Sequence, residues 1–258
     1  MRKVQFFTVL MLVFALVSCK DKNKEEDNTP AIPTTAKLIV HFKPMWGDEP
    51  FNMQQVYFDD FGNRIRSDKF MQYFSGIKLQ NVSDEYVVLK DFYLADFYNQ
   101  IDFAFDVEPG NYDHFNFDIG VPAAYNKDQD PAQYPNDHPL SVAGSQGMFW
   151  TWNTGYIFLK FEGKVDTTGT EGAELLEPVA IHIGEDPMFT RYSSPVMDLN
   201  LERGETRELN VLIHVDQIFA IGAANDIDLA TDAVTHTSTN LDLAEQFMEN
   251  YSLAITVE

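Results

Sequence analysis

Cysteine is almost absent from this sequence: Cys19 is the only one among 258 residues. A chain with one cysteine cannot form an internal disulfide. A fold held together by disulfides within the chain is therefore excluded, and the domain has to be stabilised by its apolar core. The roughly 220 residues beyond the amino-terminal region are enough to form a sizeable core within one domain.

Basic residues are scarce. The chain has 18 Lys and Arg against 40 Asp and Glu, and its formal net charge is −22 at pH 7. A surface this acidic repels the phosphates of nucleic acids and of anionic lipid headgroups. We therefore expect no nucleic acid partner, and no docking on a membrane that is driven by charge.

Catalytic motifs are missing as well. The sequence has no glycine-rich phosphate loop and no Gly-x-Ser-x-Gly nucleophile elbow. Asp128 and Asp130 resemble part of a calcium loop, but the glycine and the distal glutamate of such a loop are absent from their places. We predict that the protein is not an enzyme, since even a hydrolase has no motif in its favour.

The amino-terminal apolar run, residues 4–17, is too short to span a membrane. Arg2 and Lys3 precede it, and small residues stand near its end, which is typical of a secretory signal peptide. The sequence Leu16-Val17-Ser18-Cys19 resembles a bacterial lipobox. That resemblance implies that residues 1–18 are removed and that Cys19 becomes the lipidated first residue of the mature chain.

Residues 19–36 contain almost no apolar side chains, so we expect a lipidated, disordered tether. Its acidic run resembles the surface-export signal of some bacterial lipoproteins, although a plain solvated spacer explains it equally well. Loss of Arg2 and Lys3 changes the formal charge from −22 to −24. We predict an extracytoplasmic protein, anchored by lipid to the periplasmic face or the outer surface of the bacterial outer membrane.

What the chain does have is a series of short apolar runs and turn signals over residues 37–258. Residues 37–43 and 112–121 alternate apolar with polar side chains, which is typical of half-buried strands. This pattern predicts an all-β domain, a two-sheet antiparallel β-sandwich. A lipocalin-like closed barrel is the alternative. One short C-terminal helix is expected over residues 241–250, with Asn240 as its cap.

Three expectations concern local structure. Residues 150–161 are mostly aromatic and β-branched on both faces, which favours one central strand that Gly155 interrupts. Residues 196–201 and 206–215 flank a turn and are expected to form a hairpin. Residues 122–146 form a long proline-rich loop, and structureless loops of this length are usually functional.

Six histidines are spread along the chain. Taken singly, each is more typical of a surface or hydrogen-bonded histidine than of a metal ligand. Imidazoles that converge from different strands would suit copper better than structural zinc, because no cysteine thiolate is available. The histidines are His41, His114, His138, His182, His214 and His236.

The segment 147–163 reads GMFWTWNTGYIFLKFEG and holds two of the three tryptophans. It resembles the signature of the MbnP-like copper-binding proteins. The segments QYFSGIKL (72–79), FDIGVP (117–122) and IHIG (181–184) are similar to further motifs of that family and follow in the same order. The resemblance implies that residues 37–258 form a β-rich extracytoplasmic domain that binds one copper ion.

The resemblance also implies a ligand set. In the family, the copper ligands include histidines and a tryptophan that a di-haem peroxidase-like partner oxidises to kynurenine. Trp150 and Trp152 occupy the two tryptophan positions of the motif, and His182 occupies the histidine position. His41 and His138 are candidates for a second imidazole. Metal capture or delivery is the expected function, with copper as the metal.

Two positions depart from the family pattern. Tyr125-Asn126-Lys127 stands where the methanobactin-type relatives have Leu-Asn-His, and the cysteine that follows their histidine strand is absent. A protonated lysine repels a cation rather than binding it. The alternative function is a lipoprotein module that binds no metal and recognises a carbohydrate or a protein partner.

Overall fold

The computed structural model describes residues 33–258, except residues 154, 171, 173, 223 and 224. The expected signal peptide, Cys19 and most of the expected tether lie outside the described residues. Within the described part, no helix has both the length and the apolar character needed to cross a membrane.

The smaller sheet is organised around β1 (Ala36–Trp46). Along one edge, β1 pairs in parallel with β13 (Thr206–His214). Along the other edge it pairs antiparallel with β6 (Ile101–Val107) and β2 (Glu49–Pro50). The short strand β15 (Ile255–Val257) extends the sheet beyond β13. The alternation expected for residues 37–43 is confirmed, because every second side chain of this segment is buried.

The larger sheet is built on β4, whose first half pairs with β9 and whose second half pairs with β5 and β7. The strand order is β11-β7-β4-β9-β10-β14, with β3, β5, β8 and β12 pairing beside this path. The strands are β3 (Tyr57–Phe58), β4 (Arg64–Asn81), β5 (Tyr86–Asp96), β7 (Gly110–Ile119), β8 (Phe149–Trp150), β9 (Gly155–Asp166), β10 (Glu177–Gly184), β11 (Thr190–Ser193), β12 (Leu199–Leu201) and β14 (Val234–His236).

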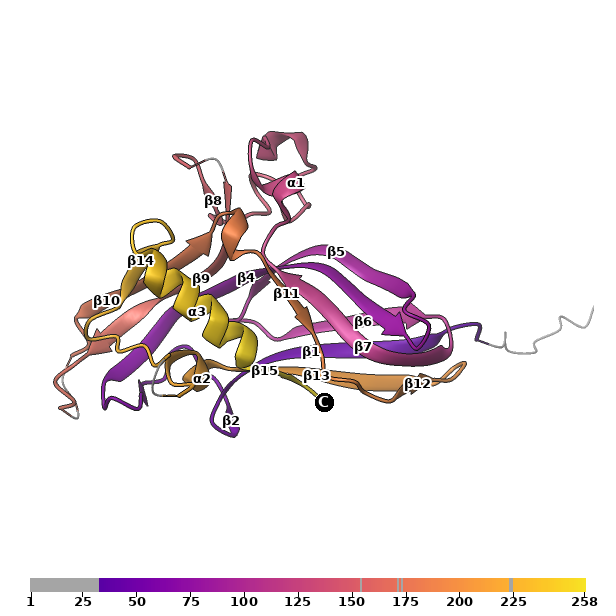
Figure 1. Cartoon of the computed structure of the whole chain (residues 1–258), viewed down its shortest axis with the longest axis horizontal. Coiled ribbons are helices and arrows are strands. Elements are labelled where there is room, and N and C mark those ends of the chain that lie inside the picture. The colour runs from indigo at the N-terminus through magenta and orange to yellow at the C-terminus, as the bar shows by residue number, and fades with distance from the viewer. Residues whose placement is uncertain (1–32, 154, 171, 173, 223–224) are drawn as a thin grey trace, which may run out of the picture. The chain divides into compact units, whose positions relative to one another are not determined.

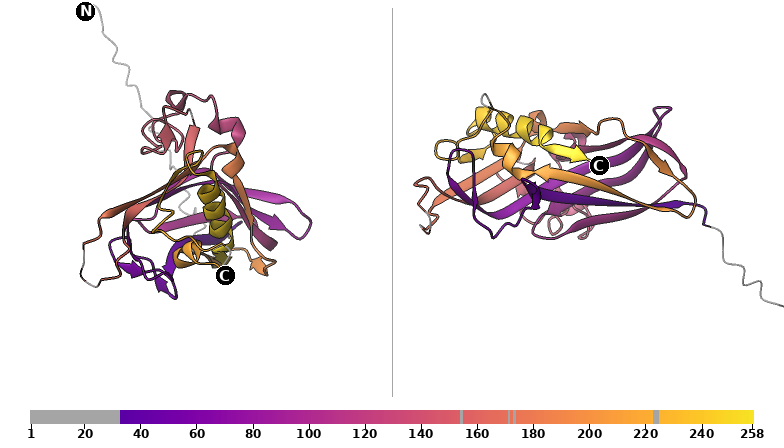
Figure 2. Two further views of the ribbon diagram at one scale, coloured as in Figure 1. Left: turned by 60° about the vertical axis from the view of Figure 1, so that its left-hand side comes forward. Right: turned by 90° about the horizontal axis from the view of Figure 1, so that it is seen from below.

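The smaller sheet lies against the larger one (Figures 1 and 2). Buried aromatic side chains join the two sheets. Phe42 of β1 lies 4.4 Å from Phe74 of β4 and 5.8 Å from Phe117 of β7, measured between ring centroids. Aromatic pairs at such separations add about 0.5–1.5 kcal/mol each beyond the burial of their area. The predicted all-β sandwich is confirmed. Two of its strand pairs, β1 with β13 and β10 with β14, are parallel rather than antiparallel.

The predicted C-terminal helix is confirmed as α3 (Leu241–Leu253). The Asn240 side chain caps it by accepting a hydrogen bond from the backbone N–H of Leu243. In Figure 1, α3 lies beside α2 (Val215–Phe219) and β14. Its Phe247 ring packs against Phe219, and its Tyr251 ring packs against the larger sheet, so the helix contributes to the same core.

The proline-rich loop, residues 122–146, contains more structure than expected. It includes a short helix α1 (Ala123–Asn126) and a 3-10 turn η1 (Pro131–Gln133). Two tyrosines of the larger sheet hold the loop, because the Tyr73 and Tyr156 hydroxyls donate to the carbonyls of Pro139 and Leu140. The loop is therefore ordered, and it covers the larger sheet where the Tyr73 and Tyr156 hydroxyls reach it.

The stretch 150–161 is not one continuous strand. β8 ends at Trp150, residues 151–153 turn, and β9 begins at Gly155, with Trp150 paired to Gly155. The turn brings the Trp152 side chain to the surface, where it is 64% exposed. β9 itself keeps the predicted character, because both of its faces are buried from Gly155 to Phe161.

The prediction of a hairpin from residues 196–201 and 206–215 is wrong. β12 pairs with β7 in the larger sheet, whereas β13 pairs with β1 in the smaller one. The turn between them does form, with the Glu205 N–H donating to the Glu202 carbonyl. It carries the chain from one sheet to the other instead of folding it back on itself.

Candidate functional site

A pocket of about 260 Å³ opens where the end of α1, the β8–β9 turn and the end of β10 meet. We call it the tryptophan pocket. Figure 1 shows α1 and β8 next to each other above the larger sheet. The pocket is lined by Asn126, Lys127, Trp150, Asn153, Gly155, Glu185, Asp186 and Pro187.

A buried asparagine fixes the pocket wall. The Asn126 side chain accepts a hydrogen bond from the Tyr156 N–H at 2.7 Å and donates to Asp186 Oδ1 at 2.8 Å. These contacts join the proline-rich loop, β9 and the segment after β10. Trp150, only 5% exposed, covers Gly184, whose missing side chain leaves room for the indole.

The backbone of Glu185 has a φ of 70°, a conformation that residues other than glycine rarely adopt. Its Oε1 accepts a hydrogen bond from Asn153 Nδ2 at 3.1 Å. Strained residues of this kind cost on the order of 1–3 kcal/mol and persist where the surrounding structure fixes them, often at binding sites. Glu185, with its carboxylate, is one of the residues that line the tryptophan pocket.

The donor set of the tryptophan pocket does not fit copper. Its lining offers amides, the carboxylates of Glu185 and Asp186, and the ammonium of Lys127, with no imidazole and no thiolate. Imidazole and sulfur ligands suit copper, whereas carboxylates suit hard cations. The indole nitrogen of Trp150 has no free lone pair, because that pair belongs to the ring, and it acts only as a donor. The lysine adds a positive charge.

Two histidines meet elsewhere, on β10 and β14. His182 and His236 are direct partners across this parallel strand pair, and their ring centroids lie 4.7 Å apart at an interplanar angle of 85°. His182 Nε2 lies 2.7 Å from Oε1 of Glu162 on β9. We call these three residues the histidine pair and its glutamate. His182 does not line the tryptophan pocket.

Burial lowers the pKa of His182 below its usual value, and the nearby charge of Lys160 acts in the same direction. The hydrogen bond and the charge of Glu162 oppose this shift without cancelling it. His182 is therefore a neutral imidazole at pH 7, which is the state that binds metals.

The other histidines named as candidate ligands lie apart from this pair. His41 lies on β1 of the smaller sheet, with Nδ1 2.6 Å from Asp102 Oδ1. His138 lies in the proline-rich loop, stacked on Tyr134 with centroids 4.6 Å apart. Its Nδ1 accepts the Leu140 N–H at 3.1 Å, so that lone pair is already in use. The two tryptophans do lie together, with ring centroids 5.3 Å apart.

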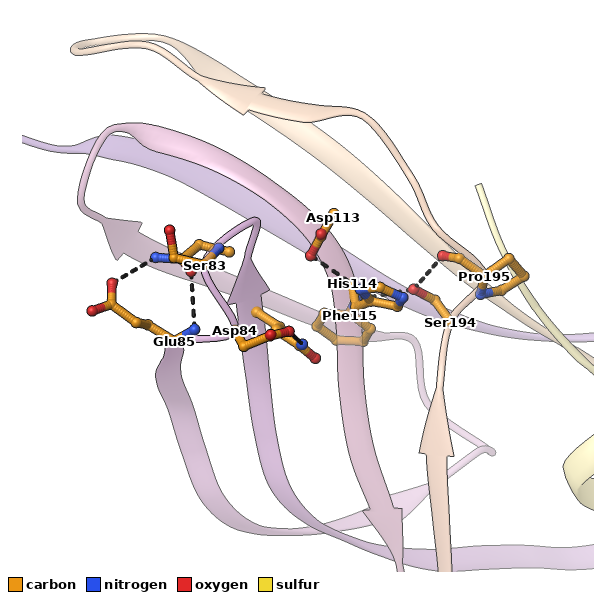
Figure 3. A network of polar contacts seen from close by, with 10 residues as sticks. Ser83, Asp84, Glu85, Asp113, His114, Phe115, Ser194 and Pro195 are labelled. Carbon is orange, nitrogen blue, oxygen red and sulfur yellow. Dashed lines mark hydrogen bonds and ion pairs between the residues drawn. The ribbon is translucent and has the colours of Figure 1, made fainter.

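Asp, His and Ser also occur near one another at the far end of β7, but in a structural arrangement (Figure 3). His114 Nδ1 lies 3.0 Å from Oδ1 of its neighbour Asp113. The Ser194 hydroxyl donates to the Pro195 carbonyl at 2.9 Å and accepts the Phe115 N–H at 3.0 Å. The bond from the Phe115 N–H to the Ser194 hydroxyl oxygen joins β7 to the segment after β11. The serine hydroxyl therefore has a structural role.

His236 was not expected at a site. It lies on a strand of three residues, too short for an alternation pattern to identify, and its partner is distant in sequence. Among the residues that the structure describes, no group of three or more His, Cys, Asp or Glu side chains is arranged to hold a metal ion. The histidine pair therefore brings two imidazoles together without a third described side chain of these types arranged to complete a metal site.

Known proteins place this chain in a family. The sequence model of the MbnP family matches residues 35–240. The solved structure of MbnP from Methylosinus trichosporium is similar in fold, with a TM-score of 0.52 and 13% sequence identity over 86% of this chain and 98% of that one. No curated protein matches the sequence. Because the family model matches most of the domain, the chain belongs to the MbnP family.

Proposed function

We propose that this chain is a lipid-anchored extracytoplasmic protein that binds one copper ion for capture or delivery, and that it catalyses no reaction. The observation that carries the proposal is the contact between the imidazoles of His182 and His236, within a domain of the MbnP family. Neutral imidazoles are the nitrogen ligands that copper prefers in proteins. The acidic surface, with its net charge of −22, also favours the approach of cations.

A copper titration of the purified full-length protein tests this function. After removal of free metal, we expect about one equivalent of copper per chain, and a loss of binding in His182→Ala. His114→Ala is the matched control, because that imidazole lies on β7 and bonds to Asp113. The absence of saturable binding in the wild-type protein, with His182→Ala behaving identically, would contradict the proposal.

A tryptophan modification belongs to the same proposal. Trp152 is 64% exposed and Trp150 is 5% exposed. Trp152 is therefore the tryptophan that a di-haem peroxidase-like partner can reach without separating β8 from β9. We expect conversion of one tryptophan to kynurenine when the protein is produced together with such a partner. Intact-mass measurement followed by peptide mapping detects the change. An unmodified mass under these conditions argues against the partner.

A second candidate function is supported by the tryptophan pocket. Trp152 offers an exposed aromatic face beside a pocket that contains amide donors, carboxylate acceptors and a lysine. Such a combination suits a polar ring ligand such as a sugar. Fluorescence titration with glucose, galactose and N-acetylglucosamine tests it. Saturable quenching in the wild type that is lost in Trp152→Ala supports this function, and a flat titration with all three excludes it for these sugars.

A further inference from the structure

We propose that the tryptophan pocket binds a free basic α-amino acid such as lysine. Lys127 meets the carboxylate of the ligand, and Glu185 and Asp186 meet its two cationic groups. The inference does not depend on copper binding, because neither His182 nor His236 lines this pocket. It also differs from the carbohydrate candidate, because a neutral sugar carries no charge for these three side chains to bind.

The three charged side chains of the pocket have no partners of opposite charge. Lys127 directly follows α1, whereas Glu185 and Asp186 follow β10, so the positive and negative groups come from different segments. Among the residues that the structure describes, none of the three takes part in an ion pair. Each charge is therefore available to a ligand.

Hydrogen bonds fix the two carboxylates and leave one oxygen of each available. Asn153 Nδ2 donates to Glu185 Oε1 at 3.1 Å, and Asn126 Nδ2 donates to Asp186 Oδ1 at 2.8 Å. Glu185 Oε2 and Asp186 Oδ2 make no hydrogen bond with any described residue. Because the amides already hold the carboxylates, a ligand has fewer side chains to order when it binds.

The size of the pocket limits the ligand. Its volume of about 260 Å³ lies below the roughly 300–1,000 Å³ of pockets that take drug-sized ligands, so it admits a small molecule. Trp150 and Pro187 belong to the lining and supply apolar surface. The methylene groups of a lysine side chain pack well on such surface while the ammonium group stays polar. A free amino acid meets both conditions.

The number of charges of each sign selects the class of amino acid. The lining contains one positive and two negative side chains. At pH 7 a basic amino acid carries the complementary set, which is one carboxylate, the α-ammonium and the cationic side chain. A neutral amino acid leaves one carboxylate of the pocket without a partner. An acidic one brings a second carboxylate into a pocket that already has two, and like charges repel.

Calorimetric titration of the purified full-length protein with free amino acids tests the inference. EDTA is present throughout, because amino acids bind copper themselves. We expect saturable binding of L-lysine with a Kd below about 1 mM. L-norleucine lacks the side-chain ammonium, lysinamide lacks the carboxylate, and Nα-acetyl-lysine lacks the α-ammonium. Each should bind about fivefold more weakly, as expected for the loss of one exposed ion pair.

Variants of the pocket provide the second comparison. Lys127→Met and Glu185→Gln keep the length of each side chain and remove its charge, so L-lysine should bind about fivefold more weakly to each. Lys127→Met should not weaken the binding of lysinamide, which has no carboxylate to lose. Lys37→Met, at an exposed position of β1, is the matched control and should bind like the wild type. Lys127 is exposed, so its replacement leaves the core intact.

The outcomes decide between ligand classes. Equal affinities for L-lysine and L-norleucine, or an unchanged affinity for L-lysine in Lys127→Met, would overturn the assignment of the charges. Tighter binding of Nα-acetyl-lysine than of L-lysine would also overturn it, because this compound resembles the last residue of a peptide. The absence of saturable L-lysine binding would refute the inference and leave the proposed copper binding untouched. Binding of a neutral sugar without binding of L-lysine would assign the pocket to the carbohydrate candidate instead.

Discussion

Gly184 lies where the end of β10 passes beneath the Trp150 ring. A Cβ at this position would lie 2.5 Å from the Tyr156 carbonyl oxygen and 2.6 Å from the indole. Neither neighbour is the end of a flexible side chain, so the backbone or the tryptophan has to move. The tryptophan pocket depends on this missing side chain.

We therefore expect Gly184→Ala to lower the free energy of unfolding by about 1–3 kcal/mol, the usual cost of overpacking. Chemical denaturation measures the loss, and tryptophan fluorescence reports the displacement of Trp150. Gly110→Ala is the matched control, because its Cβ would meet the Tyr112 ring at an ordinary 3.7 Å. Equal stability of the two variants would show that the β10 contact is not as tight as described.

Asp118 lies half-buried on β7, and burial raises the pKa of its carboxyl group while Lys78 and Arg191 partly lower it. A pKa that is higher in the folded state means that the folded protein binds the proton more tightly than the unfolded chain does. Stability contributed by this group is therefore present at low pH and is lost as pH rises through the folded pKa.

Replacement of Asp118 by Asn removes this titration. The stability of Asp118→Asn relative to the wild type should increase as the pH rises from about 3.8, the model-peptide value, toward neutrality. Denaturation curves at several pH values measure the difference. Asp106→Asn, at an exposed position on β6, serves as the control. A difference for Asp118→Asn that stays constant with pH would refute the burial argument.

At the scale of elements, Asn250 joins α3 to its surroundings. Its Nδ2 donates to the carbonyls of Ile218 at 2.9 Å and Asn225 at 2.6 Å, and the residue is fully buried. Removing the amide leaves both carbonyls without this donor, and each unsatisfied buried polar group costs about 1–3 kcal/mol. The attachment of α3 to α2 and to the segment after α2 therefore depends on the side chain of Asn250.

We expect Asn250→Ala to destabilise the domain by about 2–4 kcal/mol in thermal or chemical unfolding. Ser252→Ala, two residues further along α3, removes only a surface hydrogen bond to the Glu249 carbonyl and should change stability by less than about 0.5 kcal/mol. If both variants lose stability equally, the effect comes from the helix as a whole rather than from the amide contacts.

The elements that could be predicted are those whose signal is local. β1, β7 and α3 were found because alternation, or a cap followed by helical spacing, is contained within about ten residues. The turn at residues 151–153 was missed because aromatic residues on both sides of it continue the strand pattern. The separation of β12 from β13 was missed because a short turn can also connect two sheets.

The candidate site was only partly predictable for the same reason. His182 was identified through its motif, but its pairing with His236 depends on a parallel strand contact between distant segments. Glu162 became relevant only once β9 and β10 were seen to place it 2.7 Å from the imidazole. The periodicity of apolar residues shows which side chains lie on one face of a strand. Which strands become neighbours depends on pairing between segments that are distant in sequence.

At the scale of the whole molecule, the proposed lipid anchor at Cys19 is open to a direct test. Wild-type protein produced in a Gram-negative host should fractionate with membranes and should be released by detergent. Cys19→Ala should be found in the soluble fraction, because lipid chains supply the membrane affinity. Lys20→Ala, next to the cysteine, should behave like the wild type. Membrane association of Cys19→Ala would mean that something other than the lipid holds the protein there.

The parallel pairing of β1 with β13 has a consequence for the order in which the protein folds. β1 is the first strand of the described residues, and one of its edges remains unpaired until residues 206–214 are available. Pairings this distant in sequence slow folding, and an open strand edge invites aggregation in the meantime. A chain interrupted before residue 206 cannot close the smaller sheet. The domain therefore completes its fold only after nearly all of it has been synthesised.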